Sequence, residues 1–252
     1  MNWVTRSLYA VWGVYAWLCF ALAVVFSLLV ALFVPGMQRR QHLVAGAARS
    51  VFVMAGVNVT VTGMDKLPDE DCVVVANHAS YIDGVLLKGY LPGRFNFVIK
   101  GEMRDFAPAH FLLHRSGSKF VERNEMSGST RDARHIVKAA AQGGESLAFF
   151  PEGTFRKEPG VGRFRPGAFV AAARGKLPIV PVAISGTRFM MPSERMLPRP
   201  IRLRIDILPA ISPEQRLFDD SRVLAEAARQ QILAVLDEPD LLLREGGTSD
   251  DL

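Results

Sequence analysis

The amino-acid sequence predicts an α/β fold in which a mostly parallel sheet is flanked by helices and preceded by an N-terminal helical segment. Three observations support this prediction. A long uncharged segment opens the chain, short apolar runs follow it from residue 57 onward, and amphipathic stretches with a helical period separate those runs. Strands that alternate with helices are typical of parallel sheets covered on both faces.

The composition excludes several classes of protein. The chain has 252 residues, of which 49% are hydrophobic and 22% charged, and these values suit one sizeable domain and exclude a wholly disordered chain. Its two cysteines, Cys19 and Cys72, exclude a disulfide scaffold and a metal cage built from cysteine. Residues 237–252 carry six acidic side chains and one arginine, so a net charge of +10 remains on the first 236 residues. A basic body of that size suits an anionic partner, such as a lipid head group, a phosphorylated metabolite or a nucleic acid.

The N-terminal segment is long and apolar enough to enter a membrane. No charged residue lies in the 32 positions between Arg6 and Arg39, and residues 14–34 would form a helix of about 32 Å, close to the thickness of a bilayer core. A signal peptide has a shorter apolar region and a small-residue cleavage site, which this segment lacks. A buried helix of a soluble protein is the alternative, and the sequence leaves open whether a membrane helix would cross the bilayer or lie in one leaflet. Because Arg39, Arg40 and Arg49 follow the segment, we expect an inner-membrane location with the rest of the chain facing the cytoplasm.

Residues 39–56 mix basic and apolar side chains, which predicts an amphipathic helix. Such a helix can lie in the head-group layer of a membrane or pack on the domain behind it, and the pattern does not separate the two. We therefore assign residues 1–56 to an N-terminal membrane unit, 57–237 to the α/β domain, and 238–252 to an acidic, disordered tail.

Within the α/β domain, apolar runs predict the strands and longer amphipathic stretches predict the helices. Val57–Val61 alternates with period two, as a half-buried strand does, whereas Cys72–Ala76 is continuously apolar, as in a strand buried on both faces. Gly143 and Gly144 would end a helix at 129–142. The remaining strands are expected at 95–99, 119–121, 147–150, 179–184 and 201–208, and further helices at 168–174 and 213–236.

The loop after the second predicted strand contains a candidate base. Asn77 and His78 directly follow the strand at 72–76, and Asp83 comes five residues after the histidine. On a continuous helix His78 and Asp83 would point to different faces, so they can meet only if His78 precedes a helix and Asp83 lies in its first turns. Asp83 would then fix the imidazole tautomer so that the other ring nitrogen can accept a proton. Because Ser80 is not set in a nucleophile elbow, such a base would activate a hydroxyl of the substrate. A structural turn, in which Asn77 bonds the backbone and Asp83 caps a helix, is the alternative.

Polar side chains follow three other predicted strands. After the strand at 147–150, a loop combines a glycine that permits close backbone approach with a hydroxyl and positive charge, as an anion-binding loop does, and its carboxylate would orient a polar group or a cation. A tight turn with solvated charges is the alternative for this loop. Basic residues also follow the strands at 95–99 and 119–121, so four strand ends present polar groups to one rim of the sheet. The candidate substrate-binding residues are Asn77, Ser80, Lys100, Arg123, Glu152, Gly153, Thr154 and Arg156.

In these motifs the chain resembles the membrane-associated glycerolipid acyltransferases typified by 1-acyl-sn-glycerol-3-phosphate acyltransferase, a family with four sequence blocks. The first block, Asn-His-x-Ser-x-x-Asp, is met in full at 77–83. The second, Lys-x-Glu followed by a glycine and a terminal arginine, is similar to Lys100, Glu102, Gly117 and Arg123.

The third and fourth blocks follow in order. Phe-Pro-Glu-Gly-Thr-Arg is met at 150–154, but Phe155 occupies the arginine position. Arg156 lies one place later, and Arg163 or Arg165 could substitute for the missing arginine. The fourth block, Val-Pro in an apolar strand, is similar to residues 180–181. The resemblance therefore spans about residues 57–208, with one departure inside the third block.

The resemblance implies an enzyme that moves a fatty acyl group from acyl-CoA or acyl-carrier protein to the sn-2 hydroxyl of lysophosphatidic acid, giving phosphatidic acid. His78, oriented by Asp83, would deprotonate that hydroxyl, which would attack the thioester without an acyl-enzyme. Arg123 and the loop 152–154 would bind the acceptor, with Arg123 suited to its phosphate. Neither a cofactor nor a metal is implied. The partners would be membrane lipids, the lysophospholipid acceptor and the acyl donor, and not nucleic acid.

Several alternatives stay open on the sequence. Phe155 suggests an acceptor other than lysophosphatidic acid. The same fold could also serve a catalytically silent lipid-binding protein, or a thioesterase in which His78 activates water. His110 and His114 have a metal-compatible spacing, but the glutamate of a His-Glu-x-x-His motif is missing, so we expect a helix face there and no metal site.

Overall fold

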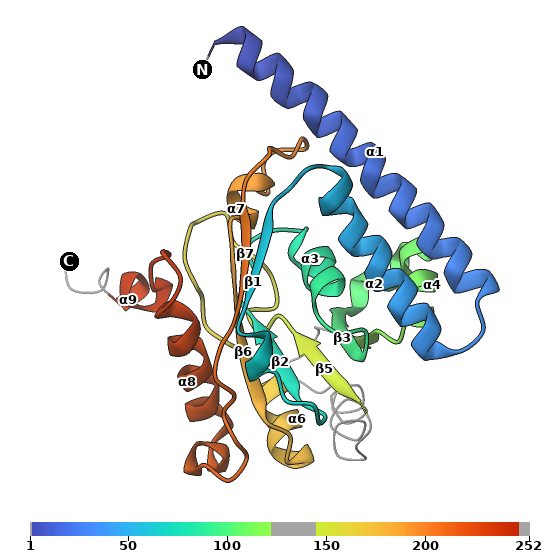
Figure 1. Ribbon diagram of the computed structural model, residues 1–252. Helices are drawn as coiled ribbons and strands as arrows, with labels where there is room; N and C mark the ends of the chain where they lie inside the picture. Colours follow the sequence, from blue (N-terminus) through green and yellow to red (C-terminus); the bar gives the residue numbers. More distant parts are fainter. Residues whose placement is uncertain (1, 122–144, 247–252) are drawn as a thin grey trace.

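The computed structural model describes residues 2–121 and 145–246 and confirms the mostly parallel α/β fold (Figure 1). Its described strands form one seven-stranded sheet in the order β1-β7-β6-β2-β5-β3-β4. Each neighbouring pair in this order is parallel except β6 and β7, which are antiparallel. The strands are β1 (Val59–Thr62), β2 (Val73–Ala76), β3 (Phe95–Lys100), β4 (Lys119–Val121), β5 (Ser146–Phe149), β6 (Ile179–Ser185) and β7 (Leu203–Ile207).

The central strand β2 is buried on both faces, as its continuous apolar run predicts. Because successive side chains of a strand point to opposite faces, Val73 and Val75 belong to one hydrophobic cluster, and Val74 and Ala76 to the other. The first cluster includes residues of α6 and α8, and the second includes residues of α2 and α3. These helices are α2 (Met37–Met54), α3 (Asp83–Tyr90), α6 (Gly167–Gly175) and α8 (Ser221–Leu233).

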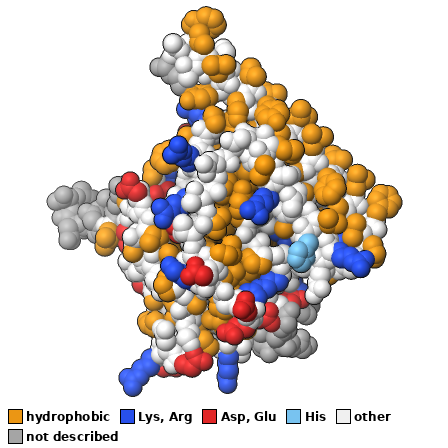
Figure 2. All heavy atoms as spheres, in the orientation of Figure 1, with side chains coloured by type: hydrophobic (Ala, Val, Ile, Leu, Met, Phe, Trp, Pro, Cys, Tyr) orange, Lys and Arg blue, Asp and Glu red, His pale blue; other side chains and the backbone are white. Residues whose placement is uncertain are grey.

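The N-terminal helix α1 (Trp3–Phe33) lies along the surface of the α/β domain and packs on α2 and on α4 (Ala107–Arg115) (Figure 1). It is the one helix in the described chain that is long and apolar enough to cross a membrane. Its outward face forms a band of hydrophobic side chains along the edge of the molecule (Figure 2). Its inward face is held by hydrogen bonds from Trp12 Nε1 to Ala55 O (3.0 Å), from Trp17 Nε1 to Met196 O (2.7 Å) and from Arg115 Nε to Ala31 O (2.9 Å).

Helix α2 packs on the domain through one face. Phe52 is 2% exposed in the cluster beneath it, and a Cβ atom on Gly89 of α3 would lie 2.7 Å from the backbone nitrogen of Arg49. The two helices therefore cross in backbone contact, which requires glycine at position 89. Leu43 and Val53 of α2 are exposed, so packing on the domain buries only some of the apolar side chains of this amphipathic helix.

Several helices differ from the expectation. Helix α4 contains His110 and His114, where the sequence led us to expect a helix face, whereas the short α7 (Thr187–Met190) was not among the expected elements. Helix α8 begins later than residue 213 because the side chain of Asp220 accepts a hydrogen bond from Arg222 N and caps it. The helix expected at 129–142 lies outside the described residues. The shorter 3-10 elements are η1 (Met64–Lys66), η2 (Gly101–Asp105) and η3 (Arg216–Asp219).

The packed structure continues past residue 238, where the sequence led us to expect a disordered tail. Asp240 pairs with Arg229 at 2.8 Å, and this arginine is 1% exposed. Helix α9 (Leu241–Gly246) follows, and Leu241 is buried. A count of acidic residues misses this because their basic partners lie on other elements. Residues 247–252 lie outside the described part of the chain.

Candidate active site

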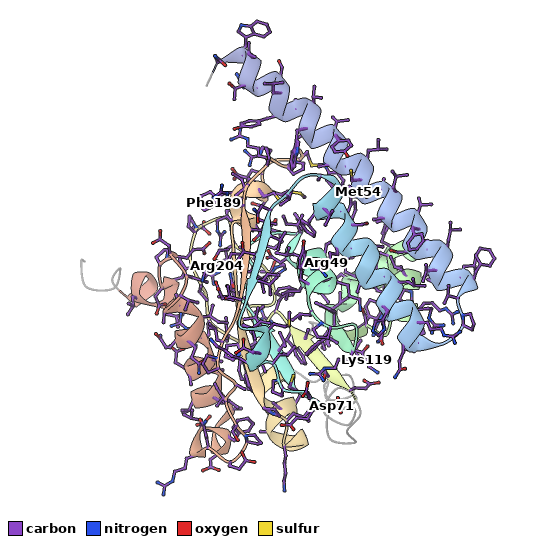
Figure 3. All side chains as sticks on the ribbon, viewed as in Figure 1. Arg49, Met54, Asp71, Lys119, Phe189 and Arg204 are labelled. Carbon is purple, nitrogen blue, oxygen red and sulfur yellow. The ribbon has the colours of Figure 1, made fainter. Side chains whose placement is uncertain are left out.

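The carboxyl ends of the parallel strands gather the candidate residues on one edge of the sheet. Asp71 and Lys119, at the amino ends of β2 and β4, lie in the lower half of the view in Figure 3, and Phe189, just past the carboxyl end of β6, lies well above them. His78 follows β2 and lies in the turn before α3, as its proposed contact with Asp83 requires. The fold thus places the candidate base where α/β proteins carry their chemistry.

His78 and Asp83 are in hydrogen-bond contact. The distance from His78 Nδ1 to Asp83 Oδ2 is 2.9 Å. The same oxygen accepts hydrogen bonds from Ala79 N (2.7 Å) and Ser80 N (2.8 Å), and Asp83 is fully buried. Three donors on one oxygen hold the carboxylate rigidly in place. Because a carboxylate oxygen accepts hydrogen bonds, we assign the proton to His78 Nδ1, which leaves Nε2 free to act as a base.

Aromatic rings enclose the imidazole of His78. The ring of Phe150 stacks on it with centroids 4.4 Å apart, and Phe155 meets it edge-on at 5.0 Å. Phe155 in turn contacts Tyr81 at 4.6 Å. The His78 side chain is left 19% exposed, so a substrate can still reach the base. Phe155, the residue that departs from the family pattern, is thus part of the wall around the base.

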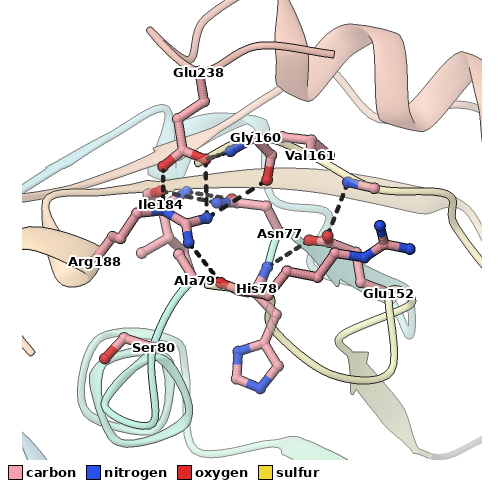
Figure 4. Close-up of polar contacts among 12 residues, drawn as sticks. Asn77, His78, Ala79, Ser80, Glu152, Gly160, Val161, Ile184, Arg188 and Glu238 are labelled. Carbon is pink, nitrogen blue, oxygen red and sulfur yellow. Dashed lines mark hydrogen bonds and ion pairs between the residues drawn. The ribbon is translucent and has the colours of Figure 1, made fainter. Parts of the chain in front are cut away.

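Glu152 fixes the backbone beside the base. Its Oε1 accepts a hydrogen bond from His78 N at 2.8 Å, and its Oε2 accepts one from Gly162 N at 3.0 Å (Figure 4). Burial raises the pKa of this carboxyl group, and the two backbone donors and His78 act in the opposite direction. Glu152 therefore connects the loop after β2 to the loop after β5. The sequence led us to expect that this side chain contacts the substrate.

Two other predicted substrate-binding residues are also engaged with the backbone. Asn77 exchanges two hydrogen bonds with Ile184 of β6, at 3.0 and 2.8 Å, and is 2% exposed. Ser80 is fully buried and donates to Met191 O at 2.7 Å. These side chains hold the His78 loop in place. Sequence spacing does not reveal this because both partners lie more than 100 residues away.

The remaining predicted residues divide into two groups. Lys100, Gly153 and Thr154 line the same cavity as His78, and Lys100 forms an ion pair with Glu102. Arg156 is not among the described residues that line this cavity, and its carbonyl oxygen accepts a hydrogen bond from Arg188. Arg123 lies outside the described residues.

The cavity at His78 has a volume of about 1190 Å³. Its wall combines polar side chains near His78 in the sequence with apolar side chains of α1, α2, β3 and α4. These include Val24 of α1, Val44 of α2, Phe97 of β3 and Leu112 of α4. The described residues contain no group of three or more histidine, cysteine or acidic side chains that could hold a metal ion. A candidate base in the wall of a largely apolar cavity suits a reaction on a substrate that has a long hydrocarbon chain.

Sequence reasoning missed an ion pair behind the loop 152–162. Arg188, two residues after Gly186 at the end of β6, contacts both carboxylate oxygens of Glu238, at 3.2 and 3.1 Å (Figure 4). It also donates to Arg156 O (2.8 Å) and Gly160 O (3.5 Å). The one sequence signal for Arg188 is its position just after the strand β6.

Comparison with known proteins identifies the family. A model of the acyltransferase family matches residues 58–185, just over half of the chain. The fold and the site define the same class, and the chain belongs to the acyltransferase family.

Named relatives narrow the comparison. The chain is 28% identical over 185 residues to 1-acyl-sn-glycerol-3-phosphate acyltransferase alpha of Mus musculus, covering 73% of this chain and 65% of the mouse protein. It is 28% identical over 207 residues to 1-acyl-sn-glycerol-3-phosphate acyltransferase of Saccharomyces cerevisiae, covering 79% and 68%. The chain thus spans about two thirds of the length of these relatives. The crystal structure of the 1-acyl-sn-glycerophosphate acyltransferase PlsC from Thermotoga maritima has a similar fold, with a TM-score of 0.71, 20% identity, and coverage of 92% of this chain and 99% of that one.

Proposed function

We propose that the protein is a lysophosphatidic acid acyltransferase that moves a fatty acyl group from acyl-CoA or acyl-carrier protein to the sn-2 hydroxyl of the acceptor. The observation that carries this proposal is the position of His78, oriented by Asp83 at 2.9 Å, in the wall of a largely apolar cavity of about 1190 Å³. The names of the mouse and yeast relatives support the same reaction.

In the proposed reaction, His78 Nε2 accepts the proton of the sn-2 hydroxyl while the hydroxyl oxygen attacks the thioester carbonyl carbon. A C–O bond forms, and the tetrahedral intermediate then breaks its C–S bond. The thiolate leaves and takes the proton that the imidazolium returns, giving phosphatidic acid and a free thiol. Asp83 stabilises the imidazolium through the Nδ1 hydrogen bond while His78 holds the proton.

Direct attack, without an acyl-enzyme, is favoured by the nucleophiles near the site. Ser80 is fully buried and its hydroxyl is bonded to Met191 O. Cys72 is also fully buried, at the amino end of β2, and burial raises the pKa of its thiol to about 11. Neither group can reach an acyl donor as an ionised nucleophile, so the substrate hydroxyl is the proposed nucleophile.

The acyl chain of a substrate would occupy the apolar part of the cavity. Ala23 and Val24 of α1 line this part together with Val44 of α2. Removal of a hydrocarbon chain from water stabilises the complex by about 0.8 kcal/mol for each buried CH₂ group. Helix α1 is thereby proposed to serve both as a wall of the cavity and as the membrane contact.

We further propose that α1 lies in one leaflet of the cytoplasmic membrane and leaves the domain on the cytoplasmic side. Its attachment points, Trp12, Trp17 and Ala31, are spread over much of the helix and all contact the rest of the chain. A helix held along its length by the domain has no free central section to cross a bilayer. Its hydrophobic outer face would instead bury itself at the membrane surface.

The proposed acceptor is lysophosphatidic acid. Arg123 is proposed to bind the phosphate of lysophosphatidic acid, so Arg123→Ala should raise the KM for the acceptor and leave the KM for the donor unchanged. Phe155 at the arginine position is compatible with another lysolipid acceptor. Assays with a panel of lysophospholipids as competing acceptors decide between lysophosphatidic acid and another lysolipid.

The decisive experiment assays the purified protein in liposomes with labelled acyl-CoA or acyl-carrier protein, with and without lysophosphatidic acid. We expect labelled phosphatidic acid from the wild type and from His114→Ala, an exposed histidine on α4, and none from His78→Ala. Labelled free fatty acid that forms without acceptor would identify a thioesterase instead. Lysolipid binding without turnover of any acceptor by either donor would identify a silent lipid-binding protein.

A further inference from the structure

Lys88 is a cation in the wall of the cavity that has no anionic partner among the described residues. It lies on α3, five residues after Asp83, on the face that also presents Gly84 and Val85 to the cavity. It forms no hydrogen bond or ion pair with any residue that the structure describes. Its Nζ lies over the ring of Phe97, 5.8 Å from the ring centroid.

The surroundings of Lys88 are unusual for a lysine. Val51, Val85 and Phe97 line the cavity together with Lys88, which is half-buried, and burial lowers the pKa of the ammonium group to about 8. A charge that is withdrawn from water without a partner destabilises a fold, and proteins usually pair such groups or replace them. A lysine that stays unpaired in a cleft beside a candidate base is therefore a candidate for ligand binding.

The other lysines of the described cavity wall do not share this property. Lys100 is paired with Glu102, and Lys157 with Glu194. A ligand that enters the cavity with a negative charge would therefore find Lys88 uncompensated, whereas the other two ammonium groups already have carboxylate partners. A compact ammonium group suits a phosphate, which accepts several hydrogen bonds.

We propose that Lys88 binds the phosphate group of a lysophospholipid acceptor and thereby selects phosphorylated acceptors over neutral ones. The inference rests on the function proposed above and adds a specificity-determining residue to it. Five residues of helix separate Asp83 from Lys88, a rise of about 7.5 Å. An acceptor whose hydroxyl meets His78 can therefore extend its phosphate along α3 toward Lys88.

The test compares acceptors with and without phosphate in Lys88→Met and Lys88→Arg. Methionine keeps the length of the side chain and removes its charge, whereas arginine keeps the charge. For Lys88→Met we expect the KM for lysophosphatidic acid to rise by about tenfold or more, as the loss of a charge-assisted hydrogen bond implies. The KM for the acyl donor and the turnover of a monoacylglycerol acceptor should not change. Lys88→Arg should recover part of the loss, and Lys66→Met, an exposed lysine outside the cavity, should match the wild type.

Other outcomes would overturn the proposal. Equal loss with both acceptors would mean that the Lys88 stem only packs on Phe97, and a higher KM for the donor would assign the charge to the acyl carrier.

Lysophosphatidic acid and monoacylglycerol are also compared as stabilising ligands in thermal melts, which need no turnover. A shift in Tm with lysophosphatidic acid that is lost in Lys88→Met supports the phosphate site even if no acyl transfer occurs. An equal shift in both proteins contradicts it even if the acyltransferase is active.

Discussion

Arg188 and Glu238 form a two-bond ion pair that ties the end of β6 to the C-terminal segment across 50 positions of sequence. The arginine also donates to the carbonyl oxygen of Arg156, and Glu238 accepts a hydrogen bond from Gly160 N at 2.9 Å. The pair therefore holds both ends of the segment that leads to Gly162, whose N–H bonds Glu152. A chain of contacts thus connects the C-terminal segment to the backbone beside the base.

We predict that Glu238→Gln lowers both stability and kcat. Arg188 would keep its charge with a neutral partner in a site where its side chain is 9% exposed, and breaking a buried pair costs about 3–5 kcal/mol. Thermal melts and initial rates measure the two effects. In Arg188→Met/Glu238→Met, stability should recover in part because no charge is left unpaired, but kcat should not, because the carbonyl groups of Arg156 and Gly160 have lost their donor. A double variant with wild-type kcat would show that the pair does not position the loop.

Asp83→Asn is expected to lower kcat strongly while the fold remains. Asp83 Oδ2 accepts all three hydrogen bonds, and its Oδ1 is buried without a partner. An asparagine can therefore place its oxygen on the His78 side and its amide nitrogen where Oδ1 was. The negative charge that stabilises the imidazolium is lost, and in the serine-protease triad the corresponding change lowers kcat by about 10⁴. Circular dichroism tests whether the fold remains, and steady-state rates measure kcat. Unchanged turnover would exclude His78 as a base oriented by Asp83.

The sequence predicts features that depend on neighbouring residues, and it misses those that depend on distant partners. The continuous apolar run of β2 and the spacing of His78 and Asp83 were sufficient to predict a buried strand and a contact at its end. Asn77, by contrast, has a polar side chain of the kind that can bind substrate, but its hydrogen-bond partner is Ile184 of β6. The contact of Arg188 with Glu238 has no local pattern at all, because tertiary packing alone brings the two together.

The crossing of α2 and α3 predicts opposite effects for two glycines of the same helix. A Cβ atom on Gly89 would lie 2.7 Å from Arg49 N, whereas nothing lies within 4 Å of a Cβ on Gly84. Gly89→Ala should therefore force the helices apart and lower stability by about 1–3 kcal/mol, as overpacking does. Gly84→Ala should raise stability by about 0.5–1 kcal/mol through helix propensity. Chemical unfolding of both variants measures the difference, and equal effects would contradict the close backbone contact.

Lys88 predicts how stability changes with pH. Burial lowers the pKa of its ammonium group to about 8, and an exposed lysine of the unfolded chain titrates near 10.4. Between these values the unfolded chain binds more protons than the folded one, so the contribution of Lys88 to stability rises with pH. Below about pH 8 both states are protonated and the full cost of the buried cation remains. Lys88→Met should therefore unfold at a higher Tm than the wild type at pH 7, by an amount that shrinks from pH 8 to 10.

Other groups at the cavity also titrate or carry charge, so the comparison needs a control. The side chains concerned are His78, Tyr81, Lys100, Glu102, Lys157 and Arg165 on the cavity wall, and Arg49 on the packed helix α2. Because all of them are present in both proteins, the difference in Tm between the wild type and Lys88→Met isolates Lys88 if the substitution does not move them. Lys66→Met, which removes an exposed lysine, should show no pH-dependent difference. A constant difference between pH 7 and 10 would mean that the Lys88 ammonium is solvated, and the argument for a buried cation would then be lost.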